Sequence, residues 1–67
     1  MTPNREYVKQ LITAKKWNVS DFARHAGISR SEATRFLNGE RVGGKKLMGG
    51  LIRAFPNEPI NKLIFLS

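Results

Sequence analysis

Basic side chains are concentrated between residues 24 and 53, where there are seven Lys and Arg but only two Glu. The whole chain of 67 residues carries a formal charge of +7, so most of the excess positive charge lies in this stretch. Ammonium and guanidinium groups bind phosphates, and arginine also pairs with the edge of guanine through two hydrogen bonds. The composition therefore favours a polyanionic partner, with nucleic acid first and an anionic membrane surface second.

The remaining composition excludes several other kinds of chemistry. The sequence has no cysteine and a single histidine, so disulfides and thiolate metal sites are excluded, and its five Asp and Glu are scattered. Residues 43–46 (Gly-Gly-Lys-Lys) lack both the spacing and the Ser or Thr of a phosphate-binding P-loop. The sequence also offers no nucleophile–base pair. We therefore predict that the chain is not an enzyme and uses no metal and no cofactor.

The length limits the architecture to one small domain over residues 1–67. Thr2 followed by Pro3 is typical of a helix start. An apolar face with helical spacing then extends this first helix to about Lys16. Trp17 is interpreted as an anchor of the following turn in the core. The basic side chains of the first helix are assigned to a solvated face: Arg5, Lys9, Lys15 and Lys16.

Two short helices meet across a glycine turn between residues 18 and 38. Asn18 predicts the start of the first of them, and Gly27 predicts its end. Ser29 with Glu32 three residues later forms a capping box, which predicts a helix from 29 to 38. Two such helices joined by a short turn with glycine are the signature of a helix-turn-helix. We expect the second helix to project four side chains outward near its N-terminal end: Arg30, Ser31, Thr34 and Arg35.

The last third of the chain is predicted as a loop over residues 40–44 and a fourth helix that ends at Pro56. Gly49 and Gly50 lie inside this helix, where each costs about 1 kcal/mol relative to alanine. We interpret the pair as a site of close packing against another helix, with a break of the helix at this point as the alternative. The tail over residues 59–67 is rich in large apolar side chains, and its pattern leaves both a helix and an extended strand open. Its longest apolar run is far too short to span a membrane.

The pattern resembles the lambda-repressor-like, Cro/repressor-type helix-turn-helix family over nearly the whole chain, from about Val8 to Leu63. The positions that carry the resemblance are Phe22-Ala23, Gly27, Ile28-Ser29, Ala33, Phe36 and Asn38-Gly39, followed by Leu47, Leu51, Ala54 and Phe55. The resemblance implies an all-α domain of four to five helices. Val19 stands where the family usually has Gln, so a phosphate contact from that side chain is not implied, and Gly49-Gly50 is also atypical.

The resemblance also implies roles for single residues. Arg30, Ser31 and Arg35 match the family's base-reading positions, and Thr34 projects from the same helix. Asn38 matches a residue that contacts the phosphate backbone. We assign further phosphate contacts to residues at the ends of neighbouring elements: Asn18, Arg41, Lys45 and Lys46. Arg53 receives no role.

These roles predict a sequence-specific DNA-binding transcriptional regulator, and a repressor in particular, that inserts the helix 29–38 into the major groove of an inverted-repeat operator. We expect a cytoplasmic protein of prokaryotic or phage type, with double-stranded DNA as its partner. The alternative is a DNA-binding partner in another assembly, such as an antitoxin or an accessory factor in recombination or plasmid control. A membrane-surface module is disfavoured because the apolar helix faces are used in the core.

The apolar tail predicts how the chain assembles. One recognition helix reads only a few base pairs, so a single copy cannot select one site in a genome. We therefore expect a homodimer, at least on DNA, with Ile64, Phe65 and Leu66 in the dimer interface. If the chain is instead a DNA-binding partner in another assembly, the tail binds another protein of that assembly. A third possibility is that the whole tail closes the core of a monomer.

Overall fold

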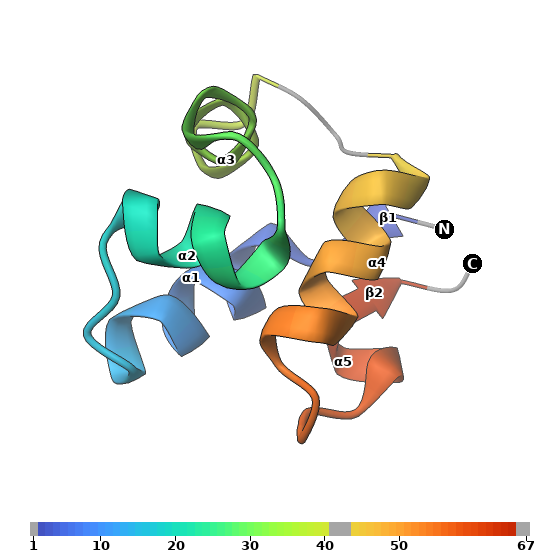
Figure 1. Ribbon diagram of the computed structural model, residues 1–67. Helices are drawn as coiled ribbons and strands as arrows, with labels where there is room; N and C mark the ends of the chain where they lie inside the picture. The colour runs from blue at the N-terminus through green and yellow to red at the C-terminus, as the bar shows by residue number, and fades with distance from the viewer. Residues whose placement is uncertain (1, 41–43, 66–67) are drawn as a thin grey trace.

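The computed structural model describes residues 2–40 and 44–65 (Figure 1). The elements in these ranges are β1 (Thr2–Pro3), α1 (Arg5–Ala14), α2 (Val19–Ala26), α3 (Arg30–Leu37), α4 (Lys45–Ala54), α5 (Ile60–Leu63) and β2 (Ile64–Phe65). The helices dominate, and the short strands only join the two ends of the described chain. The predicted all-α domain with a helix-turn-helix is therefore confirmed.

The first helix begins later than the sequence suggested. Thr2 and Pro3 do not open it, because they form β1, which pairs antiparallel with β2 in the register Thr2↔Phe65 and Pro3↔Ile64. Pairing requires extended backbone, so the cap moves to Asn4, whose side chain accepts a hydrogen bond from the backbone N–H of Tyr7 at 3.2 Å. The helix also ends earlier than predicted, at Ala14.

Both helices of the helix-turn-helix have the predicted caps. Asn18 and Asp21 form a reciprocal capping box at the start of α2, and Ser29 and Glu32 form one at the start of α3. Gly27 ends α2 in the left-handed conformation at φ 70°, which an L side chain rarely adopts. The turn between the helices is therefore defined by two local signals that were visible in the sequence, Gly27 and the capping box of Ser29 and Glu32.

The core lies where α2 packs against α3 on one side and α4 on the other (Figure 1). Its largest fully buried side chains are Phe22, Phe36, Phe55, Leu51, Leu63 and Val8. Trp17 stacks on Phe55 with ring centroids 5.4 Å apart, which confirms its role as an anchor of the turn after α1. Trp17 also stacks against His25, with ring centroids 4.1 Å apart.

The tail is a short helix followed by a strand, so both readings of its pattern were partly right. Ile64 is 3% exposed and belongs to the core, which makes its assignment to a dimer interface wrong. The reason is that β2 alternates its side chains, with Ile64 inward and Phe65 outward at 53% exposure. Leu66 lies outside the described residues. In the ranges that the structure covers, no helix is long and apolar enough to cross a membrane.

Candidate nucleic-acid interface

The outward face of α3 gathers the four side chains that were predicted to read bases. They line one shallow depression together with Glu40, which follows the helix: Arg30, Ser31, Thr34 and Arg35. The opposite face of the helix is buried through Ala33 and Phe36. Because the buried face fixes the rotation of α3, the polar face must point away from the core. The described residues thus bring all four predicted side chains together on one exposed surface.

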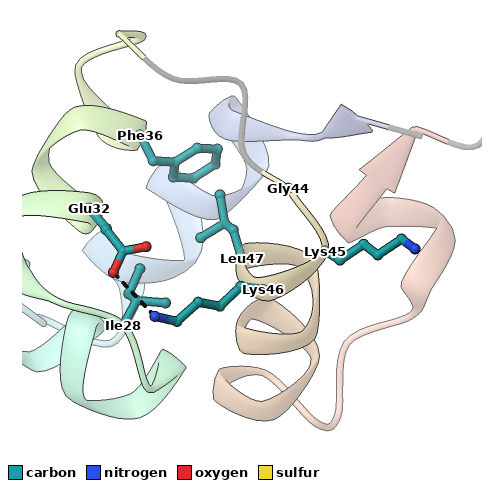
Figure 2. A pocket seen from close by; sticks show the side chains of 7 residues that line it. All are labelled: Ile28, Glu32, Phe36, Gly44, Lys45, Lys46 and Leu47. Atoms are coloured by element: carbon teal, nitrogen blue, oxygen red, sulfur yellow. Dashed lines mark ion pairs between the residues drawn. The ribbon is translucent and has the colours of Figure 1, made fainter.

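Glu32 lies on a different side of α3, toward α4. Its carboxylate accepts the backbone N–H of Ser29 at 3.2 Å, and its Oε1 atom lies 3.5 Å from Nζ of Lys46 (Figure 2). The Ser29 N–H, with further help from the Ser29 hydroxyl and from Lys46, lowers the pKa of Glu32 below its ordinary value of 4.5. Glu32 is therefore a capping residue, as the sequence indicated.

A pocket separates α3 from the start of α4, with Ile28, Phe36 and Leu47 as its apolar lining (Figure 2). The ion pair of Glu32 and Lys46 closes one side of this pocket. It links the capping box of α3 to the first turn of α4. The Lys45 side chain points away from Glu32, so the two neighbouring lysines face different surroundings.

The N-terminus of α4 is positive in character. Gly44 is its N-cap and makes no side-chain cap hydrogen bond, and the first turn contains no acidic residue. Lys45 and Lys46 are both exposed in that turn. The first N–H groups of a helix have no partner within the helix, so a helix end with two lysines in its first turn favours a phosphate.

Two asparagines were predicted to contact phosphate, and both are exposed. Asn18 uses its Oδ1 atom to accept the N–H of Asp21 at 2.8 Å, so a phosphate would be bound by its Nδ2 donor. Asn38 follows α3 as its C-cap. Arg41, the remaining predicted phosphate contact, lies outside the described residues.

Comparison with known proteins agrees with this geometry. The family model of the Cro/C1-type helix-turn-helix DNA-binding domain matches residues 8–49. The chain belongs to this family. No curated protein and no solved structure is significantly similar to the chain. The matched region contains α2, α3 and the N-terminus of α4, whereas α5 and β2 lie outside it.

Two arginines of this Cro/C1-type domain have contacts that the sequence did not indicate. Arg5 was assigned to a solvated face, but it is half-buried and its Nε donates to the carbonyl oxygen of Phe36 at 2.8 Å. Arg53 was given no role, yet its Nη2 donates to the carbonyl oxygen of Ala26 at 3.3 Å. These partners are 31 and 27 residues away along the chain, so no local pattern could have revealed them.

Proposed function

We propose that this Cro/C1-type domain is a sequence-specific DNA-binding transcriptional regulator, and that α3 is its recognition helix. The observation that carries the proposal is the single exposed face formed by Arg30, Ser31, Thr34 and Arg35. Arg30 and Ser31 open α3 at its N-terminal end, which is the end that enters the major groove in helix-turn-helix proteins. Thr34 and Arg35 lie one turn further along the same face. The family supports DNA binding itself, and the sequence preference is our inference from the side chains.

The side chains suggest how the bases would be read. A guanidinium donates two hydrogen bonds to O6 and N7 of guanine, and a good pair of this kind is worth about 1–3 kcal/mol of discrimination. Arg30 and Arg35 are suited to this contact, and Ser31 and Thr34 can bond to several bases. Phosphates on either side would be held by Asn18, Asn38 and the lysines at the start of α4, with Arg41 as a further candidate. A helix held in a promoter in this way represses transcription by excluding the polymerase.

We further propose that the domain acts as a homodimer on an inverted-repeat operator. Phe65 supports this part of the proposal, because a large apolar side chain at 53% exposure loses water contact when a second copy covers it. Ile60 is also half-exposed in the same tail. The interface proposed here contains Phe65 and Leu66 but no longer Ile64. Burying one such side chain is worth about 1.5–3 kcal/mol.

The alternative function uses the same recognition helix within a larger assembly. The exposed Phe65 favours it as much as a dimer, because an apolar side chain can equally be covered by another protein. An antitoxin or an accessory factor in recombination or plasmid control would fit. The mass of the complex that co-purifies with the chain separates the two cases.

A selection from randomised duplex DNA tests the main proposal. The purified chain should enrich one motif in which two half-sites are related by inversion and lie about one helical turn apart. The double variant Arg30→Ala, Arg35→Ala is the control and should enrich no motif. Failure of the wild-type chain to enrich any sequence over the starting pool would contradict the proposed function.

A further inference from the structure

Both helices of the helix-turn-helix end beside a glycine with positive φ. Gly27 follows α2 at φ 70°, and Gly39 lies just after α3 at φ 83°. An arginine guanidinium from outside the motif lies against each of them. A Cβ added to Gly27 would lie 3.3 Å from the guanidinium of Arg53. A Cβ added to Gly39 would lie 3.6 Å from the guanidinium of Arg5.

Each of these guanidiniums also reaches the backbone of the helix that has just ended. The last carbonyl groups of a helix have no partner within the helix, and they form the negative end of its dipole. Arg5 donates to the carbonyl of Phe36 in the last turn of α3, and Arg53 donates to the carbonyl of Ala26, the last residue of α2. A positive group with several donors suits both the charge and the hydrogen bonding of such an end.

Arg5 makes the stronger of the two contacts. Its Nε–O distance to Phe36 is 2.8 Å, against 3.3 Å for Arg53 and Ala26. Its guanidinium carbon also lies 5.7 Å from the centre of the Phe36 ring, within the range of a cation–π interaction. Arg5 therefore connects α1 to both the backbone and the side chain of one buried residue of α3.

We propose that Arg5 is a positioning residue of the recognition helix, which it holds from α1, and that Arg53 supports from α4 the turn that leads into this helix. The proposal rests on the proposed function of α3. Hydrogen bonds to bases require the reading side chains to be placed to within about 0.5 Å and 10–20°. The helix α3 has only eight residues, and a helix of that length is not stable by itself. Its orientation must therefore come from contacts at its ends and on its buried face.

The proposal predicts a specific pattern of losses. When the guanidinium of Arg5 or Arg53 is removed, α3 still carries Arg30 and Arg35, so attraction to phosphates remains. What is lost is the common orientation of the reading side chains, and with it the preference for one sequence. A phosphate contact by Arg5 would behave differently, since its removal would weaken binding to all sequences and lower the salt dependence by about one unit.

The test uses two duplexes of equal length, one with the sequence selected by the wild-type chain and one scrambled. Fluorescence anisotropy gives the affinity of each variant for both duplexes over a range of salt concentrations, and circular dichroism confirms that the helices are formed at the temperature used. The variants are Arg5→Gln, Arg5→Lys and Arg53→Gln. Lys9→Gln is the matched control, because it removes one positive charge from the exposed face of the same helix α1.

We expect Arg5→Gln to reduce the ratio of the two affinities by about tenfold, the cost of one good base contact, with little change on the scrambled duplex. Arg53→Gln should show the same pattern to a smaller extent, and Lys9→Gln should keep the ratio. Arg5→Lys keeps the positive charge but lacks the planar guanidinium, so it should recover the preference for the selected duplex only in part. If Arg5→Gln does not fold, the affinity ratio of Arg5→Lys tests the proposal in its place.

Three results would overturn the proposal. One is an unchanged ratio in Arg5→Gln, or in Arg5→Lys when that variant decides. Another is an equal loss on both duplexes with a lower salt slope, which would make Arg5 a phosphate contact. The last is a wild-type chain without any preference, which would contradict the proposed function itself and this inference with it.

Discussion

The carbonyl oxygen of Ala26 lies 2.5 Å from the position that a Cβ on Gly50 would occupy. At this distance only a glycine permits α4 to approach the end of α2. Gly49, the neighbouring residue, faces open space. The pair of glycines therefore has two different explanations, and the predicted close packing is confirmed for Gly50 alone. This approach holds α4 against the end of α2, just before the turn that leads to α3.

Gly50→Ala is expected to destabilise the domain, whereas Gly49→Ala is expected to stabilise it. Both changes gain about 1 kcal/mol of helix propensity, but overpacking against backbone costs about 1–3 kcal/mol, so the clash outweighs the gain at Gly50. Urea unfolding of the two variants and the wild-type chain measures the difference. If Gly50→Ala were as stable as Gly49→Ala, the close contact between α2 and α4 would be contradicted.

The capping box of α3 predicts a dependence of stability on pH. The folded chain lowers the pKa of Glu32, chiefly through the Ser29 N–H, so the carboxylate stabilises the folded state above its ordinary pKa of 4.5. This contribution disappears as the pH falls through the lower pKa of the folded state. The stability difference between wild-type and Glu32→Gln should therefore be larger at about pH 7 than at about pH 3.

Thermal unfolding of both chains over this pH range checks the prediction. Glu40→Gln removes the same charge from an exposed residue outside the capping box and is the control. A difference between wild-type and Glu32→Gln that stayed constant with pH would show that the Glu32 carboxylate does not act as a cap.

Local signals in the sequence were sufficient for the helix-turn-helix. Capping residues such as Ser29 act within three residues, and Gly27 needs only its own φ, so both could be located without knowledge of the rest of the fold. The start of α1 was predicted two residues early because Thr2 has an alternative partner at the other end of the chain. Pairing with β2 decided the conformation of Thr2 and Pro3, and a local pattern contains no information on such a partner.

At the candidate site, too, local patterns could be predicted from the sequence and contacts with distant parts of the chain could not. The outward face of α3 follows from helical spacing around the buried Ala33 and Phe36, so the side chains that we propose to read bases could be listed from the sequence. Arg5 and Arg53 could not be found in this way, because their partners are backbone carbonyls far along the chain. Nor could the spacing distinguish Lys45 from Lys46, of which the structure pairs only the second with Glu32.

Lys45→Ala should weaken binding to every DNA sequence by a similar factor and lower the slope of log affinity against log salt by about one unit. The reason is that Lys45 would neutralise a phosphate, which is present in all sequences alike. Affinities measured on the selected and scrambled duplexes at several salt concentrations give both quantities. Lys9→Ala, on the exposed face of α1, is the control, and a slope for Lys45→Ala equal to that of wild-type would remove Lys45 from the interface.

Phe65→Asp should abolish dimerisation without unfolding the chain, because the side chain is 53% exposed. The carboxylate would be buried without a partner in a dimer but would remain in water in a monomer. Light scattering, with and without an operator duplex, measures the mass, and Asn57→Asp adds the same charge at an exposed turn as the control. A wild-type chain that stays monomeric even on its operator would contradict the proposed dimer.

Arg35→Ala should relax the base preference at one or two positions of each half-site and weaken specific binding by about 1–3 kcal/mol. Binding to the scrambled duplex should fall much less, since the loss concerns a base contact. Repeating the randomised selection with this variant identifies the positions that have lost their preference. Equal losses on both duplexes would reassign Arg35 to the phosphates.

Methylation interference on the selected duplex tests most directly whether α3 reads bases in the major groove. Dimethyl sulfate methylates N7 of guanine in the major groove and N3 of adenine in the minor groove. We predict that N7 methylation at particular guanines in each half-site blocks binding of the wild-type chain, and that Arg35→Ala relieves the block at one of them. Interference confined to adenine N3, or none at any guanine, would contradict the assignment of α3 as the recognition helix.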